Sequence, residues 1–296
     1  MSIFTTLRTK IPRAMLRGAW FGSSGFTGLT QILVGRNDGY GEQPWERMLS
    51  VIEWNRRFLK CETVFIEWNP PEDRPLYSPE LVKLFPDIYC YIMSKEIHLE
   101  LAGEKAKPFQ EFYAKNAGIR RARTKWVMVT NTDIIIGPDV LNHVKDLHDL
   151  SLPRTRRVDI PYGGSTPSLW YMLDGRRYIR FRDVCSLLSS APGDCTIATK
   201  ELWEKVGGYD ENTGGKQVFC DCRGMLQLAH YGGELKWVGT HFHFDHPGSS
   251  SYGHDPANHG EAFDYEAGIP YKNNDNWGLA GVNEKEIGER IWECSF

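Results

Sequence analysis

Short apolar runs alternate with amphipathic segments in the first half of the chain, and this alternation constrains the fold most. Apolar runs at residues 31–34, 63–66 and 125–130 have the length and composition of strands. Residues 44–58 and 109–123, which lie between them, carry apolar side chains near helical spacing. A strand, a helix and a second strand in this order form a parallel pair with a right-handed crossover. The sequence therefore predicts an α/β fold with a mostly parallel central sheet and flanking helices.

Polar clusters follow the three predicted strands. They are Gly35, Arg36 and Asp38 after the first strand, Glu67 after the second, and Asn131, Thr132 and Asp133 after the third. Ligands of open α/β sheets bind beyond the carboxyl ends of the strands, so we expect a binding site at these clusters. A carboxylate such as that of Asp133, placed beside a diphosphate, is what a Mg²⁺ or Mn²⁺ site requires. The alternative is that Asp133 only caps a turn.

Composition and charge narrow the classes of partner. The 296 residues include 35 Lys and Arg against 38 Asp and Glu, and this net charge of −3 gives no global reason to bind nucleic acid. No apolar run approaches the 18 residues of a membrane-spanning helix. The seven cysteines are odd in number and scattered, which indicates reduced thiols and a cytoplasmic location.

The sequence indicates one structural domain with four segments. Residues 1–25 form a basic arm without acidic residues, for which two interpretations stay open. The arm packs on the domain, or residues 1–21 lie on an anionic membrane as a peripheral contact. Residues 26–150 and residues 151–247 are expected to form the two halves of the domain. Residues 248–296 are rich in Gly, Asn, His and aromatic side chains and are expected to form a tail or lid.

Four segments occur in an order that resembles a known enzyme family. The segments are Lys115-Asn116-Ala-Gly118-Ile-Arg-Arg-Ala122, the strand that ends in Asn131-Thr132-Asp133, Gly207-Gly208-Tyr209-Asp210-Glu211, and Asp221 with the residues that follow it to Gly233. Together they resemble the nucleotide-sugar-dependent glycosyltransferases of the GT-A fold, particularly family 2. The chain departs from that family at Asn131, where the first acid of a D-x-D motif is usual, and at Glu67, where Asp is common.

The resemblance implies a single GT-A-type domain, with residues 26–150 as the nucleotide-sugar-binding half and residues 151–247 as the acceptor-binding and catalytic half. It implies a metal-assisted glycosyltransferase, with a UDP-sugar as the expected donor and a glycan or another hydroxyl as acceptor. It implies Mn²⁺ or Mg²⁺ as cofactor, a place in polysaccharide synthesis, and Asp221 as the general base of an inverting reaction. A retaining outcome stays open, and Asp221 also fits the N-cap of a helix. The implied donor-nucleotide residues are Gly35, Arg36, Asp38, Glu67, Lys115, Asn116, Arg120 and Asn131. The implied contacts to the donor sugar or acceptor are Asp194, Trp203 and Trp277.

A second motif, His241-x-His243-x-Asp245-His246, offers metal ligands near the end of the chain. In isolation it is the signature of metallo-β-lactamase-type hydrolases, so a zinc-dependent hydrolase is an alternative. Only 50 residues follow His246, which is too short for the second half of that fold. The resemblance to GT-A enzymes, which often supply a late histidine beside the D-x-D carboxylate, implies that His243 and His246 join Asp133 as metal ligands, and we expect His241 to be structural. A non-catalytic nucleotide-sugar-binding protein is the other alternative, because Asn131 replaces an acid.

Overall fold

The computed structural model describes residues 28–40, 43–137, 140, 143–144, 147–161, 194–212, 220–232, 234–246 and 272–296. The expected basic arm lies outside the described residues, as do residues 248–271 of the expected tail. Within the described part, no helix has both the length and the apolar character needed to cross a membrane.

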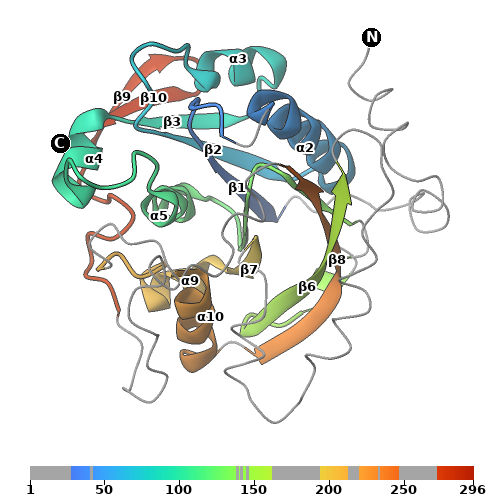
Figure 1. Cartoon of the computed structure of the whole chain (residues 1–296). Helices are drawn as coiled ribbons and strands as arrows, with labels where there is room; N and C mark the ends of the chain where they lie inside the picture. Colours follow the sequence, from blue (N-terminus) through green and yellow to red (C-terminus); the bar gives the residue numbers. More distant parts are fainter. Residues whose placement is uncertain are drawn as a thin grey trace.

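A seven-stranded sheet with the order β7-β4-β1-β2-β3-β10-β9 forms the centre of the molecule (Figure 1). Its strands are β1 (Leu29–Gly35), β2 (Glu62–Trp68), β3 (Tyr89–Met93), β4 (Trp126–Thr130), β7 (Cys195–Thr199), β9 (Asn283–Gly288) and β10 (Ile291–Ser295). The five inner strands run parallel to one another, and β7 and β9 join the two edges antiparallel. The predicted α/β class with a mostly parallel central sheet is confirmed.

Helices cover both faces of this sheet (Figure 1). They are α2 (Pro44–Leu59), α3 (Tyr77–Leu84), α4 (Lys95–Ala102), α5 (Glu111–Arg121), α9 (Lys200–Val206) and α10 (Cys220–His230). Leu33 and Phe65 point to the α2 and α3 side, and the alternate residues Ile32 and Ile66 point to the α5 side. A Cβ atom on Gly118 would lie 2.3 Å from Ile32 Cγ2, so this glycine allows α5 to approach the sheet closely.

A second sheet of three strands lies beside the first, with the order β5-β8-β6 (Figure 1). It consists of β5 (Ile134–Ile136), β6 (Ser151–Pro161) and β8 (Glu234–Asp245). The short strand β5 follows β4 after three residues and pairs antiparallel with β8, Ile134 opposite His243. The backbone N–H of Phe244 donates to the carbonyl of Asp133 at 2.9 Å. The chain thereby brings the carboxyl end of β4 against the end of β8.

The end of the chain differs from the expectation of a tail or lid. Residues 283–295 instead form β9 and β10, and β10 pairs in parallel with β3 inside the central sheet. The hydrophobic pattern of the sequence did not indicate these strands, because the side chains from Asn283 to Ile287 in β9 are exposed and mostly charged. Burial of Ile291 and Cys294 anchors β10 in the sheet.

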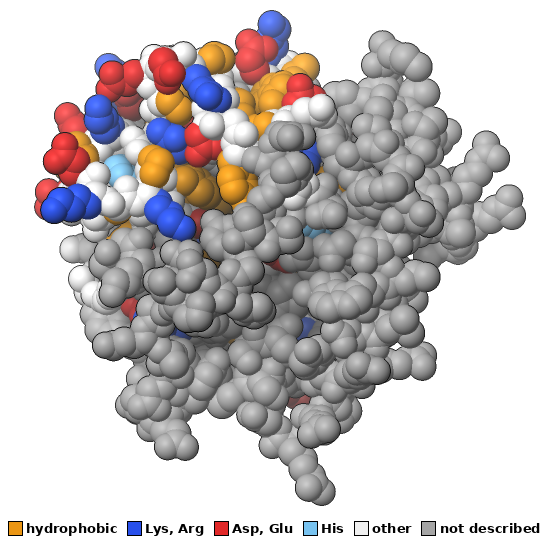
Figure 2. Space-filling view, in the orientation of Figure 1, with side chains coloured by type: hydrophobic (Ala, Val, Ile, Leu, Met, Phe, Trp, Pro, Cys, Tyr) orange, Lys and Arg blue, Asp and Glu red, His pale blue; other side chains and the backbone are white. Residues whose placement is uncertain are grey.

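One face of the molecule carries side chains of both charges. Figure 2 shows Lys and Arg interspersed with Asp and Glu among hydrophobic side chains on the described part of this face. Oppositely charged neighbours among the described residues include Lys95 and Glu72, whose atoms Nζ and Oε1 lie 3.1 Å apart. In this view the described residues therefore form a mixed surface, the usual arrangement for a water-exposed face.

Candidate functional site

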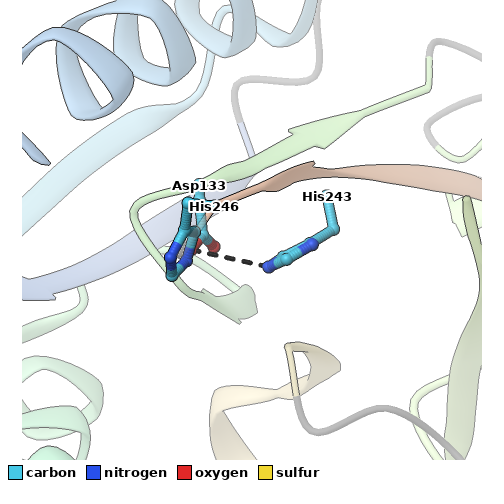
Figure 3. A group of neighbouring side chains, drawn as sticks. All are labelled: Asp133, His243 and His246. Carbon is cyan, nitrogen blue, oxygen red and sulfur yellow. Dashed lines mark hydrogen bonds and ion pairs between the residues drawn. The ribbon is translucent and has the colours of Figure 1, made fainter. Parts of the chain in front are cut away.

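Three predicted metal ligands lie together at the edge where β4, β5 and β8 meet. His246 Nε2 lies 3.0 Å from Asp133 Oδ2, and His243 Nε2 lies 3.6 Å from the same oxygen. One ligand atom from each of the three side chains lies within 4.8 Å of the other two. Figure 3 shows both imidazole rings beside the Asp133 carboxylate. All three residues are buried, so the fold supplies a compact group of one carboxylate and two imidazoles.

Strand pairing explains why residues 110 positions apart in the sequence meet. The register of β5 against β8 sets Ile134 opposite His243, and Asp133 directly precedes Ile134. His241 and His243 lie on the same face of β8 because side chains alternate along a strand. His246 follows the last residue of β8 and completes the group from beyond the strand end.

The charge state of Asp133 also fits a cation site. Burial acts to raise the pKa of Asp133, but the hydrogen bond with His246 and the charges of His243, His246 and Arg47 lower it below its usual value. The carboxylate is therefore ionised at neutral pH. Its second oxygen, Oδ1, is buried and has no hydrogen-bond partner among the described residues. A buried carboxylate oxygen without a partner is costly unless a ligand completes it, so these residues fit a divalent cation.

The end of β1 lies next to this group, as the sequence predicts. A Cβ atom on Gly35 would lie 3.1 Å from the ring of Phe65 and 3.9 Å from Thr132 Cγ2. Arg36 Nε donates a hydrogen bond of 2.7 Å to the carbonyl of Asn69, and Arg36 Nη1 lies 3.4 Å from Asp38 Oδ2. Arg36 is thus held in a fixed position at the ends of β1 and β2.

Two residues near the metal-ligand group were absent from the predicted site. The ring of Tyr40 packs edge-on against the ring of His246, with centroids 5.6 Å apart, and Tyr40 is 49% exposed. Arg47 is buried in α2, donates to the carbonyl of Tyr40 at 3.2 Å and lowers the pKa of Asp133. The sequence could have indicated Tyr40, because it is an aromatic residue that closely follows the polar cluster after the first strand. No sequence pattern distinguishes Arg47 from a charged residue on the exposed face of a helix.

Three further predicted residues lie close together at the start of β7. Asn131 Nδ2 donates to Asp194 Oδ1 at 3.2 Å, and the backbone N–H of Asn131 donates to the carbonyl of Asp194 at 3.2 Å. Lys115 is 1% exposed, and its Nζ lies 2.5 Å from Glu111 Oε1. Burial acts to lower the pKa of Lys115, but the charges of Glu111 and Asp194, among others, raise it above its usual value. Lys115 is therefore a buried cation near Asp194.

Asn116 has a structural role instead of the donor contact expected of it. Its Nδ2 donates to the carbonyl of Tyr209 and to Glu211 Oε1, both at 2.8 Å, and its Oδ1 accepts from the Tyr209 N–H at 2.7 Å. A Cβ atom on Gly208 would lie 2.4 Å from Asn116 Oδ1. Two of the motifs noted in the sequence thus bind each other, and we no longer propose Asn116 as a donor ligand.

Glu67 is also accounted for by the fold. One carboxylate oxygen accepts from the Tyr77 N–H at 2.7 Å, and the other accepts from the Ser78 N–H at 2.9 Å and from Ser78 Oγ at 2.7 Å. Glu67 therefore receives the first backbone N–H groups of α3, a common role for a carboxylate at a helix start. We no longer propose that it contacts the donor nucleotide.

The two tryptophans expected to contact a sugar are buried. Trp203 is 0% exposed in the core beside Tyr209, with ring centroids 5.0 Å apart. Trp277 is 3% exposed, and the guanidinium of Arg120 lies 4.9 Å from its ring centroid. Arg120 also donates to the carbonyl of Asp275 at 3.1 Å. The geometry corrects the expectation for both tryptophans, since neither ring offers an open face, and it gives Arg120 a packing role.

Asp221 and His241 lie on other elements around the site. Asp221 is half-buried in the first turn of α10. Burial raises the pKa of Tyr209 to about 12, and the charge of Asp221 contributes to this increase, so the two side chains are near each other. His241 Nδ1 lies 2.7 Å from Thr155 Oγ1, and His241 does not belong to the group formed by Asp133 and the two other histidines. The side chain of Asp245 lies outside the described residues.

No protein-family model matches the chain, and no curated protein matches it in sequence. Among solved structures it is similar to the mannosyltransferase PcManGT from Pyrobaculum calidifontis in complex with GDP-Man and Mn²⁺, with 16% identity and a TM-score of 0.49 over 84% of this chain and 66% of that one. It is also similar to S. aureus TarS, with 10% identity and a TM-score of 0.49 over 74% of this chain and 60% of that one. A third similar structure is GalNAc-T7 with UDP, GalNAc and Mn²⁺, with 14% identity and a TM-score of 0.49 over 74% of this chain and 43% of that one. The chain spans less than two thirds of the length of each. At these identities the similarity concerns the fold alone.

Proposed function

We propose that this chain is a metal-dependent glycosyltransferase that transfers a sugar from a nucleotide-sugar, with a UDP-sugar as the expected donor, to a hydroxyl group of a glycan or another acceptor. The observation that carries the proposal is the group of Asp133, His243 and His246 at the carboxyl ends of the strands. Ligands of open α/β sheets bind at this edge. One of the motifs that resemble family 2 glycosyltransferases ends in Asp133, and the others lie on α5, after α9 and on α10.

Asp133, His243 and His246 would hold the cation. A divalent cation bound there supplies a Lewis acid that neutralises the diphosphate of the leaving nucleotide. Two imidazole ligands favour a transition metal over Mg²⁺, which prefers oxygen, so we propose Mn²⁺ as the cofactor. The unpartnered Oδ1 of Asp133 supports this assignment, because it leaves one buried ligand atom free for the ion.

Residues at the ends of β1 and β4 would bind the donor. The planar guanidinium of Arg36, fixed by the carbonyl of Asn69, suits a base or a phosphate. Lys115 places a buried positive charge near Asn131 and Asp194, where an anionic donor would gain from it. Tyr40 adds a half-exposed aromatic ring next to His246.

Asp221 would act as the general base. Asp221 lies in the first turn of α10, where the backbone N–H groups favour a negative charge. It would accept the proton of the acceptor hydroxyl as that oxygen attacks the anomeric carbon and the nucleoside diphosphate leaves. Attack from the side opposite the leaving group inverts the anomeric centre.

The hydrolase alternative has less support. It requires His241 in the metal site, whereas His241 is bonded to Thr155 and lies outside the group of potential ligands found among the described residues. Measuring donor consumption distinguishes the transferase from the non-catalytic alternative, because a binding protein would bind the donor without consuming it.

The test is release of nucleoside diphosphate from UDP-glucose, UDP-N-acetylglucosamine, UDP-galactose and GDP-mannose with a panel of oligosaccharide acceptors, in Mn²⁺ and in EDTA. We expect one donor to be consumed in Mn²⁺ only. Asp221→Asn should lower kcat by about 10²–10⁴-fold while the KM for the donor stays unchanged, because it removes a base and keeps the shape of the side chain. Donor binding without consumption by any acceptor would support the binding protein instead, and no binding of any donor would refute the proposal.

A further inference from the structure

Among the strands that the structure describes, none covers one edge of the short strand β5. Its other edge pairs with β8, and β5 lies at the end of the three-stranded sheet. The uncovered edge faces α2, where the side chain of Asn55 supplies its hydrogen-bond partners. Asn55 Nδ2 donates to the carbonyl of Ile134 at 3.1 Å, and the Ile136 N–H donates to Asn55 Oδ1 at 3.0 Å. Asn55 itself is 0% exposed.

The amide of Asn55 takes the place of a neighbouring strand. A carboxamide offers one acceptor and a donor group, as a peptide group does, so it can satisfy a backbone carbonyl and a backbone N–H at the same time. Buried backbone groups of this kind need partners. The position of β5 is therefore fixed from both sides, by the β8 backbone and by a single side chain of α2.

This strand also sets the geometry of the metal-ligand group. Asp133 directly precedes Ile134, whose carbonyl Asn55 holds, and Ile134 lies opposite His243 in the β5 and β8 pairing. The face of α2 that carries Asn55 thus acts on Asp133 through the backbone of β5.

We propose that Asn55 is a positioning residue for the metal site, which holds Asp133 at the distance from His243 and His246 that a divalent ion requires. The inference rests on the proposed function only in assuming that these three residues bind an ion. A purely structural role is the competing explanation. In that case loss of Asn55 would lower stability without changing the affinity of the folded protein for the ion.

The test compares Mn²⁺ binding by wild type, Asn55→Leu and Asn55→Asp. Leu removes both hydrogen bonds at similar side-chain size, and Asp keeps the acceptor for the Ile136 N–H. The matched control is Asn273→Leu, because Asn273 is a buried asparagine that likewise joins backbone segments, through bonds of 2.7 Å to the Gly207 carbonyl and 3.0 Å from the Glu211 N–H. Free Mn²⁺ is measured by electron paramagnetic resonance, at a temperature where circular dichroism shows each variant to be folded.

We expect Asn55→Leu to raise the dissociation constant of Mn²⁺ by about 10–100-fold, the usual effect of losing a residue that orients a metal ligand. Asn55→Asp should lie between Leu and wild type, and Asn273→Leu should lower the melting temperature at unchanged Mn²⁺ affinity. A folded Asn55→Leu that binds Mn²⁺ as wild type does would overturn the proposal. If Asn55→Leu does not fold, the Mn²⁺ affinity of Asn55→Asp tests the proposal. Wild-type Mn²⁺ affinity in Asn55→Asp would then overturn it.

The same data separate this inference from the proposed function. A wild type that binds Mn²⁺ but transfers no sugar refutes the transferase and leaves the role of Asn55 intact. An active wild type together with an unaffected Asn55→Leu refutes the positioning role alone. A wild type that binds no Mn²⁺ refutes both.

Discussion

Two buried polar regions of this chain differ in how their hydrogen bonds are completed. The side-chain amide of Asn116 forms hydrogen bonds with the backbone of Tyr209, and the carboxylate of Glu67 accepts hydrogen bonds from the first backbone N–H groups of α3. In the group around Asp133, one carboxylate oxygen faces two histidines and the other has no partner among the described residues. Burial of a polar residue therefore does not mark a functional site. What distinguishes the group around Asp133 is an unpartnered carboxylate oxygen beside two further potential metal ligands.

The two carboxylates also differ in charge environment. The pKa of Glu67 is raised, because burial outweighs the hydrogen bonds from Ser78 and Tyr77, which are neutral groups. The pKa of Asp133 is lowered, because histidines and Arg47 outweigh the effect of its burial. A carboxylate kept ionised inside the protein can act as a ligand to a cation, whereas Glu67 only needs to accept hydrogen bonds.

The largest expected effect comes from Asp133. Asp133→Asn keeps the shape of the side chain but removes the negative charge and a ligand oxygen, so we expect Mn²⁺ affinity to fall by more than about 100-fold, beyond the loss usual for a residue that only orients a ligand. Isothermal titration with Mn²⁺ measures it. Affinity within the range of wild type would show that the ion binds elsewhere.

A smaller effect on Mn²⁺ affinity distinguishes His243 from His241. His243→Ala should weaken Mn²⁺ binding by about 10–100-fold or more, since it removes a ligand. His241→Ala should lower the melting temperature and leave Mn²⁺ affinity unchanged, because His241 contacts Thr155 and is not in the group. The opposite ranking, with His241 essential for metal binding, would favour the zinc hydrolase.

The smallest effect concerns Glu67 and its pH dependence. Because the folded-state pKa of Glu67 is raised, its contribution to stability is present below its unfolded value near 4.5 and is lost as the pH rises through the folded value. Glu67→Gln should therefore lower the free energy of unfolding most at acidic pH, by about 1–3 kcal/mol. Urea unfolding from pH 4 to 8 measures the difference. A difference that grows with pH would contradict the assigned environment, and a change in Mn²⁺ affinity would contradict the separation of the two regions.

The sequence allowed the metal-ligand group to be anticipated for physical reasons. A carboxylate after an apolar strand lies at the ligand-binding edge of a parallel sheet, which identified Asp133. The histidine motif near the end of the chain, together with the resemblance to GT-A enzymes, led to the prediction of His243 and His246. The predicted strands at 31–34, 63–66 and 125–130 all fall within or overlap strands of the central sheet.

Other features of the site could not be derived from one sequence. Asn116 and Glu67 stand in polar motifs that look the same whether their partner is a ligand or the backbone. Trp203 lies in α9 and Trp277 in a polar turn, and both are buried in a core cluster that includes residues of α5 and α10 from distant parts of the chain. Strand β9 carries exposed charges, so no apolar pattern revealed it.

The central claim is that Asp133, His243 and His246 bind an ion that helps to hold a nucleoside diphosphate. The most direct measurement is the melting temperature of the wild-type chain with UDP or GDP, in Mn²⁺ and in EDTA, because a ligand that binds the folded state raises it. We predict an increase with one nucleotide in Mn²⁺ that disappears in EDTA. An increase of equal size in EDTA, or no increase with either nucleotide in Mn²⁺, would contradict the claim.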